Sequence, residues 1–174
     1  LIVHAAVRGG ADAARLGAET GFDPALAADP DARIPLSTEA AYRRFRVARL
    51  RVFLEAIENE FRRATNQPQV PRRGYPIEHI LPQKWQDHWA VDGLEAEVER
   101  AAHVHRLGNL TLLTTSLNSK VSNAAWNVKR DALLVHDTLL LNSRLLTHSG
   151  DSPWGETAIE ARTSQLIDVL LTVW

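Results

Sequence analysis

The residues best suited to chemistry are an adjacent glutamate and histidine, Glu78 and His79, and two later asparagines, Asn109 and Asn118. A neutral imidazole can accept a proton from water near pH 7. A carboxylate and an amide oxygen suit a hard cation such as Mg²⁺, which takes its other ligands from water and substrate phosphate. Together these residue types are suited to the hydrolysis of a phosphodiester.

Two extended segments are expected to position the first three of these residues. Residues 75–82 are bracketed by prolines, and residues 110–115 are rich in threonine and apolar side chains. Neighbours on a strand point to opposite faces, so Glu78 and His79 can share a site only near an irregular strand end. Pro82 supplies such an end.

A helical pattern follows the second extended segment and carries the other polar candidates. Asn118 is expected at the start of this helix, nine residues after Asn109. That spacing is compatible with a strand, a turn and a helix start. Lys120, Asn123 and Lys129 then lie on or near the helix.

Composition excludes several classes of protein. The chain has 174 residues, of which 45% are apolar and 24% charged, values typical of a globular domain and not of a disordered chain. It has no cysteine, which excludes disulfides and thiolate metal sites. The net charge is −1, so any binding of nucleic acid must come from a local patch.

The remaining pattern predicts an α+β fold that is mostly helical. An apolar stripe predicts a long helix at about 38–65, within an N-terminal helical part at 1–70. A proline- and glycine-rich segment ends it and marks the boundary with a second part at 71–174. Short helices are expected around Trp85 and Trp89 and at 94–102. A helix broken near Asp137 and a last helix opened by residues 152–154 complete the pattern.

The ends of the chain suggest a larger parent. The sequence begins Leu1-Ile2-Val3 and has no methionine, so we expect a C-terminal fragment of a larger protein. No apolar run approaches ~18 residues and no signal peptide is visible, so a cytoplasmic protein is the default expectation.

Four short runs of sequence resemble a known nuclease domain. They are Glu78-His79-Ile80-Leu81-Pro82-Gln83, His105-Arg106-Leu107-Gly108-Asn109-Leu110-Thr111-Leu112-Leu113, Asn118-Ser119-Lys120 and Ser122-Asn123. In this order they resemble the HNH (His-Me finger) domain at the C-terminus of GmrSD-type restriction endonucleases, a domain similar to one in the restriction protein SspE. The resemblance covers about 75–174 and implies a ββα-metal motif, a hairpin plus helix, embedded in a helical domain.

The resemblance also implies a role for each residue. His79 would be the general base and Asn109 would orient it, while Glu78 and Asn118 would bind Mg²⁺ or Mn²⁺. An asparagine at the position of Asn118, where many relatives have histidine, favours these ions over Zn²⁺. The candidates for contact with DNA or its phosphates are Lys120, Asn123, Lys129, His105 and Arg106.

The implied function is that of a metal-dependent endonuclease which nicks or cuts duplex DNA in bacterial anti-phage restriction. The implied partners are DNA and an N-terminal nucleotide-hydrolysing sensor domain of the parent protein, with no role for a membrane. Three other functions stay open: a catalytically silent module that binds DNA or a partner, a ribonuclease with the same site, and a helical regulatory domain.

Each candidate residue also has a purely structural interpretation. His79 could be a core histidine, Asn109 a turn residue and Asn118 a helix N-cap. A zinc site at His103 and His105 is disfavoured because no further ligands are well spaced. Five arginines could form a phosphate-binding patch or belong to a solvated surface of mixed charge; they are Arg44, Arg51, Arg62, Arg72 and Arg73.

Overall fold

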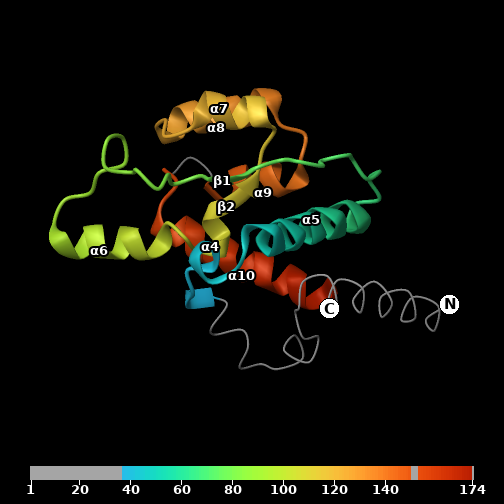
Figure 1. The fold of residues 1–174 in the computed structure, drawn as a ribbon, viewed down its shortest axis with the longest axis horizontal. Helices are drawn as coiled ribbons and strands as arrows, with labels where there is room; N and C mark the ends of the chain where they lie inside the picture. Colours follow the sequence, from blue (N-terminus) through green and yellow to red (C-terminus); the bar gives the residue numbers. More distant parts are fainter. Residues whose placement is uncertain (1–36, 150–152, 174) are drawn as a thin grey trace.

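A computed structural model describes residues 37–149 and 153–173, so the helical pieces expected before residue 37 lie outside the described residues. The described part is mostly helical with one small sheet, as the sequence predicts (Figure 1). Its elements are α4 (Ala41–Arg44), α5 (Val47–Ala64), β1 (Ile77–His79), α6 (Leu94–His103), a 3₁₀ turn (Leu107–Asn109), β2 (Leu110–Leu112), α7 (Thr115–Val121), α8 (Trp126–His136), α9 (Leu140–Ser149) and α10 (Glu156–Val173). Among these described helices, none is long and apolar enough to cross a membrane.

The prediction of one long helix at 38–65 is wrong in its first third. The backbone is extended at Phe45 and Arg46, which separates α4 from α5. The break allows α4 to dock beside the later segment, where the backbone N–H of Tyr42 donates to the carbonyl of His105 at 3.0 Å. A contact across the fold therefore overrides a local pattern that favours helix.

The expected helix around Trp85 and Trp89 is also absent, since residues 83–92 form turns and bends. Both tryptophans are buried, and the indole N–H of Trp89 donates to the carbonyl of Ala124 at 3.0 Å. The two tryptophans are therefore four residues apart because an irregular loop places both in the core, and not because they lie on one face of a helix. The expected helix at 94–102 is confirmed as α6, and the break near Asp137 is confirmed by the gap between α8 and α9.

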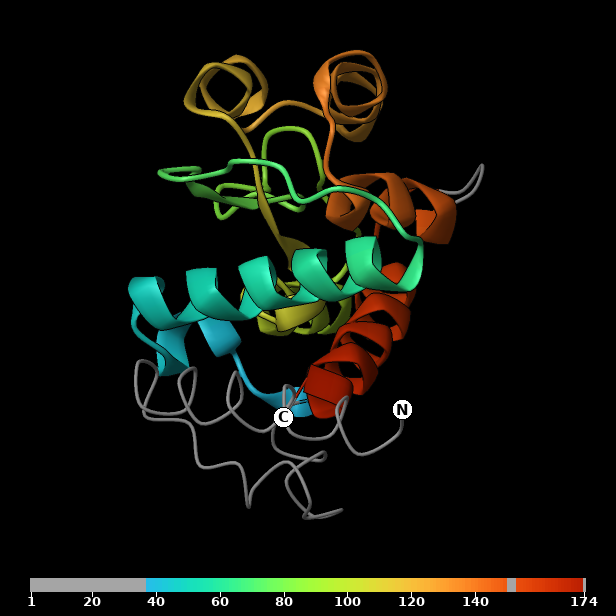
Figure 2. The ribbon, with the colours of Figure 1, turned by 90° about the vertical axis from the view of Figure 1, so that its right-hand side faces the viewer.

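The sheet pairs β1 with β2 in antiparallel register, with Ile77 opposite Leu112, Glu78 opposite Thr111 and His79 opposite Leu110. Two strands of three residues cannot be stable alone. The sheet is held between two apolar clusters, one built mainly from α5, β2, α9 and α10 and the other from the segment after β1 with α7 and α8. Figure 2 shows α7 and α8 on one side of the strands and α5 and α10 on the other.

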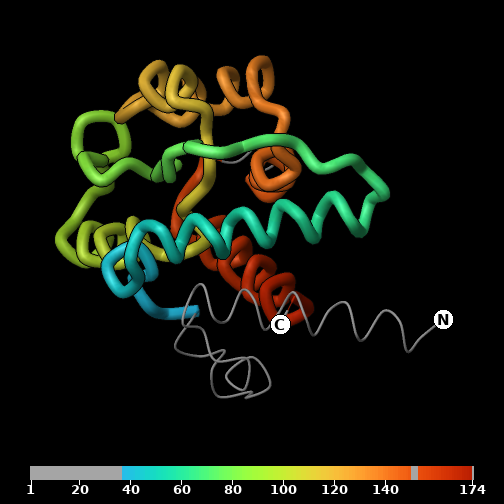
Figure 3. Tube along the Cα trace, turned by 45° about the vertical axis from the view of Figure 1, so that its right-hand side comes forward, coloured from blue at the N-terminus to red at the C-terminus, as the bar shows by residue number. Residues whose placement is uncertain are grey.

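Helix α5 is connected to the part of the chain after residue 71 by hydrogen bonds to a buried carboxylate. Glu58 is fully buried, and its side chain accepts hydrogen bonds from the backbone N–H groups of Leu140 and Leu141, at 3.2 and 2.7 Å. Arg62 donates to the same carboxylate at 2.6 Å. These bonds satisfy N–H groups in the first turn of α9. Helix α5 therefore shares a core with β2, α9 and α10 across the expected boundary at 70/71. Figure 3 shows the path of α5 beside α9 and α10.

The turn before β2 depends on close contact with α10. A Cβ atom at Gly108 would lie within 3.0 Å of the carbonyl oxygen of Ile159 and of the backbone nitrogen of Thr163. The N–H of Gly108 donates to the Thr163 hydroxyl at 3.0 Å, and the guanidinium of buried Arg162 donates to the Gly108 carbonyl at 2.5 Å. Only glycine allows this approach.

We therefore predict that Gly108→Ala lowers the free energy of unfolding by about 1–3 kcal/mol, because the added methyl group would displace α10. Urea denaturation followed by circular dichroism measures this change. Gly155→Ala is the matched control, since a Cβ there would meet only the Arg100 side chain at an ordinary 3.9 Å. Equal midpoints for the two variants would contradict the prediction.

Candidate functional site

Four of the residues singled out in the sequence line one pocket of about 320 Å³: Glu78, His79, Asn118 and Asn123. The first two come from β1, the third from α7, and the fourth from the connection between α7 and α8. The other lining residues are Pro82, Gln83, Ser119 and Ser122. Pro82, Gln83, Ser119 and Ser122 had not been chosen as site residues, although Ser119 and Ser122 lie next to Asn118 and Asn123 in the sequence.

Thr114 determines how α7 presents Asn118. Its hydroxyl accepts a hydrogen bond from the backbone N–H of Leu117 at 3.2 Å, so Thr114 is the N-cap of the helix. The prediction that Asn118 stands at the helix start, and its alternative interpretation as the N-cap, are therefore wrong. Asn118 lies one turn into α7, where the helix directs it toward the end of β1.

Two features of the pocket wall raise the free energy of the folded chain, an unpaired polar atom and an unfavourable backbone angle. The side-chain oxygen Oδ1 of Asn118 is buried, and no described residue donates a hydrogen bond to it. Ser122 has a backbone φ of 31°, in a region that side-chain-bearing residues rarely adopt. An unpaired buried acceptor costs about 1–3 kcal/mol, which a ligand in the pocket would recover.

His79 lies in an aromatic environment and is 5% exposed. Its ring is 4.5 Å from that of Tyr42 and 5.4 Å from that of His105, measured between centroids, and both contacts are edge-on. Its Nε2 is buried with no hydrogen-bond partner among the described residues. Burial, followed by the charges of His105 and Lys129, lowers the pKa of His79 to about 3. The imidazole is thus neutral at pH 7, the form that can accept a proton.

Lys129 is fully buried, which contradicts its expected role in binding phosphate. From α8 its ammonium donates to the carboxylate oxygen Oε1 of Glu78 at 2.7 Å and to the backbone carbonyl of His79 at 2.8 Å. Burial raises the pKa of Glu78 and lowers the pKa of Lys129, and the attraction between the two opposes both shifts. Lys129 therefore holds the two site residues of β1 in place and does not reach solvent.

Asn109 is also fully buried, in the 3₁₀ turn just before β2 and not on the strand. Its Oδ1 accepts from the N–H of Leu81 at 2.8 Å and from the indole N–H of Trp154 at 3.1 Å. Its Nδ2 donates to the carbonyls of Leu81 and Val104 at 2.8 and 2.7 Å. The expected direct bond to the His79 ring is absent from these contacts. Asn109 instead fixes the backbone two residues beyond His79.

The remaining candidates lie outside the pocket. Lys120 is exposed on α7 and its ammonium is 3.0 Å from Nε2 of His136. Arg106 forms an ion pair with Glu160 on α10 at 3.0 Å. His105 is 6% exposed and stacks on Tyr42 at 5.9 Å, so its ring is part of the wall behind His79.

No zinc site forms from the two neighbouring histidines. His103 has both ring nitrogens engaged, with the carbonyl of Glu99 at 2.7 Å and the carboxylate of Glu160 at 2.9 Å. Across residues 37–149 and 153–173, no group of three or more His, Asp or Glu side chains is arranged to hold a metal ion. The acidic lining of the pocket is the carboxylate of Glu78, beside which lie amide and hydroxyl oxygens.

A family model described as the C-terminal domain of GmrSD restriction endonucleases matches residues 27–169. The chain belongs to this family. The match begins well before residue 75, where the resemblance had been expected to start, and it includes the whole pocket and α5. Membership of the GmrSD C-terminal family implies a nuclease of the restriction-endonuclease type. Comparisons with curated proteins and with solved structures gave no match.

The low pKa of His79 leads to a test of the site's electrostatics. We predict that its ring stays neutral down to about pH 4, as measured by ¹⁵N NMR of the imidazole nitrogens. In the unfolded chain the pKa is about 6.5, so only the unfolded state takes up this proton as pH falls from about 6.5 towards 3. The free energy of unfolding should therefore decrease over that window, by at most about 1.4 kcal/mol per pH unit from this group.

The control for this test is His79→Asn, in which that share of the pH dependence should disappear. A midpoint between pH 6 and 7 for the ring of His79 in the folded protein would contradict the prediction.

Proposed function

We propose that this chain is a metal-dependent endonuclease that nicks or cuts duplex DNA. The observation that carries the proposal is the convergence of Glu78, His79 and Asn118 on one pocket, although 40 residues separate the first from the last. The chain belongs to a family of restriction endonucleases, and its pocket is lined by a neutral imidazole, a carboxylate and an amide. Together these two observations favour phosphodiester hydrolysis over the other chemistries of these side chains.

In this proposal β1, β2 and α7 form the ββα-metal motif of HNH nucleases. Two observations support the assignment. Helix α7 begins three residues after β2 ends, and the pocket is bounded by the end of β1 on one side and by α7 on the other. The rest of the fold then serves to hold a short hairpin and a short helix at a fixed separation.

The residues of the pocket fit a hard divalent cation such as Mg²⁺ or Mn²⁺. Asn118 presents an unpaired buried oxygen, and Glu78 presents a carboxylate whose Oε1 is already oriented by Lys129. Two protein ligands are few, but Mg²⁺ usually keeps several waters and takes ligands from substrate phosphate. When bound, the ion would neutralise charge on the phosphate and on the leaving oxygen.

His79 is the residue proposed to accept the proton of the attacking water. Its ring is neutral and held edge-on by Tyr42 and His105, so its orientation is fixed before substrate binds. Substrate phosphates would add negative charge beside the ring and raise its pKa towards a more effective range for a base. Asn109 acts as a positioning residue through Leu81.

The proposed biological setting is anti-phage restriction, in which a nucleotide-hydrolysing sensor domain of the parent protein would direct the nuclease to its DNA. The family's description as restriction endonucleases supports this setting.

The test is cleavage of supercoiled plasmid by the 174-residue chain with Mg²⁺, Mn²⁺ or EDTA. We predict metal-dependent conversion to nicked or linear DNA, and a loss of about 10²–10⁴-fold in rate for His79→Ala because the general base is removed. His88→Ala, which alters an exposed histidine outside the pocket, is the matched control and should cleave at the unmodified rate.

Three outcomes would contradict the proposal or favour an alternative to it. Full activity in His79→Ala would contradict the assigned base. Cleavage of RNA with intact plasmid in every lane would favour the ribonuclease, and plasmid binding without turnover in the presence of metal would favour the silent module.

A further inference from the structure

The strongest concentration of charge in the chain lies at the junction of α4 and α5. Five of the 20 lysines and arginines fall within nine residues, and no acidic residue occurs from 40 to 54. The five are Arg43, Arg44, Arg46, Arg49 and Arg51. In a chain of net charge −1, such a cluster must be balanced by acidic residues elsewhere, so it creates a local positive field.

Among the residues that the structure describes, few contacts engage the side chains of these arginines. Arg43, Arg44 and Arg46 are exposed and Arg49 is half-buried. Arg44 forms an exposed ion pair with Glu39 at 3.3 Å, an interaction worth little in water. Within residues 37–149 and 153–173, the other three have no ion pair with a carboxylate.

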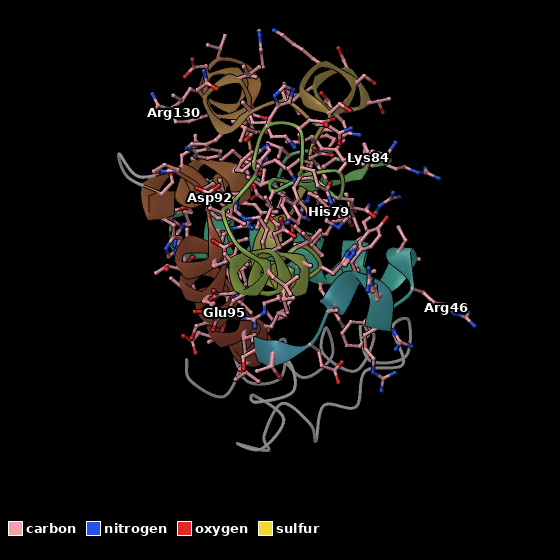
Figure 4. All side chains as sticks on the ribbon, turned by 90° about the vertical axis from the view of Figure 1, so that its left-hand side faces the viewer. Arg46, His79, Lys84, Asp92, Glu95 and Arg130 are labelled. Carbon is pink, nitrogen blue, oxygen red and sulfur yellow. The ribbon has the colours of Figure 1, made fainter. Side chains whose placement is uncertain are left out.

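The cluster adjoins the candidate site through Tyr42. The ring of Tyr42 contacts that of His79, and its backbone N–H is bonded to His105, so α4 is docked directly behind the pocket. In Figure 4, Arg46 and Lys84 extend from the same edge of the molecule, with His79 between them. Lys84 is exposed and follows Gln83, which lines the pocket.

We propose that Arg43, Arg44, Arg46 and Arg49, the arginine corner, bind phosphates of duplex DNA beside the pocket. The choice of DNA as ligand rests on the proposed nuclease function. Guanidinium groups bind phosphate oxygens in bidentate geometry, and such contacts position a duplex without reading its sequence. The corner would hold the backbone on one side of the scissile phosphate, a role that Lys129 cannot fill because it is fully buried.

The break between α4 and α5, which follows from the docking of Tyr42 onto His105, also suits the proposal. An uninterrupted helix would distribute these arginines around its axis. The extended backbone at Phe45 and Arg46 instead turns α4 onto the site while Arg43 and Arg46 stay exposed.

The experiment compares two double variants that remove the same charge. Arg43→Gln/Arg46→Gln changes the corner, and Arg63→Gln/Arg130→Gln changes two arginines whose side chains are 73% and 42% exposed on other parts of the surface. Binding of a fluorescent 20-base-pair duplex is measured in EDTA, from 50 to 200 mM NaCl. Arg43, Arg46 and Arg63 are exposed and the side chain of Arg130 is 42% exposed, so melting followed by circular dichroism should show that both variants fold.

The corner variant should bind the duplex roughly tenfold more weakly at 100 mM salt. The slope of log K against log salt is negative, and its magnitude should decrease by about 2, because each lost phosphate contact removes about 0.9. The control should stay within about twofold of the unmodified chain. Equal weakening in both variants would assign binding to overall charge and overturn the proposal, as would the absence of duplex binding or a preference for RNA.

Plasmid cleavage by the same proteins separates this proposal from the nuclease assignment. If the arginine corner binds DNA but the unmodified chain does not cleave plasmid, the proposal for the corner stands and the nuclease assignment is contradicted. If cleavage depends on His79 but the corner variant binds the duplex as tightly as the unmodified chain, the nuclease assignment stands and the proposal for the corner is contradicted.

Discussion

The four hydrogen bonds of the Asn109 side chain are the constraint on which the site geometry depends. They join the segment after β1, the end of α6 and the residue Trp154 ahead of α10 through one fully buried amide. Each donor or acceptor left unpaired in that environment would cost about 1–3 kcal/mol, so the three segments can move apart only at a large cost. Because Leu81 is fixed by two of these bonds, the position of His79 two residues earlier is fixed as well.

A second constraint acts on β1 from the opposite side. Lys129 reaches down from α8 to the carboxylate of Glu78 and the carbonyl of His79. A buried ion pair of this kind contributes little net stability, but it orients its members, and removing one partner leaves a charge buried without compensation. Strand β1 has three residues and is too short to be stable alone. The hydrogen bonds of Asn109 and Lys129 hold it in place, so that it can support the candidate site.

The parts of this structure that the sequence predicts are those set by local chemistry. Prolines around residues 75–82 and the β-favouring residues at 110–112 specify two strands, and the break at Asp137 follows from an interrupted apolar pattern. The convergence of Glu78 with Asn118 was expected from the resemblance of these runs of sequence to HNH nucleases, and the pocket contains both residues.

The parts that could not be predicted depend on partners distant in the chain. Nothing within the sequence around Phe45 breaks a helix, and the break follows from the docking of Tyr42 onto His105. A lysine on an amphipathic helix is usually exposed, and the burial of Lys129 requires Glu78, 51 residues earlier. Asn118 and Thr114 are both acceptable N-caps, and only the helix itself decides between them.

We propose that Glu78 and Asn118 hold a divalent cation beside His79. Anomalous scattering from Mn²⁺ in crystals of the His79→Ala variant with a short DNA duplex tests it most directly. We predict one peak in the pocket, about 2.0–2.6 Å from a carboxylate oxygen of Glu78 and from Oδ1 of Asn118. A pocket without a peak while DNA is bound, or a Mn²⁺ ion held by other side chains, would contradict it.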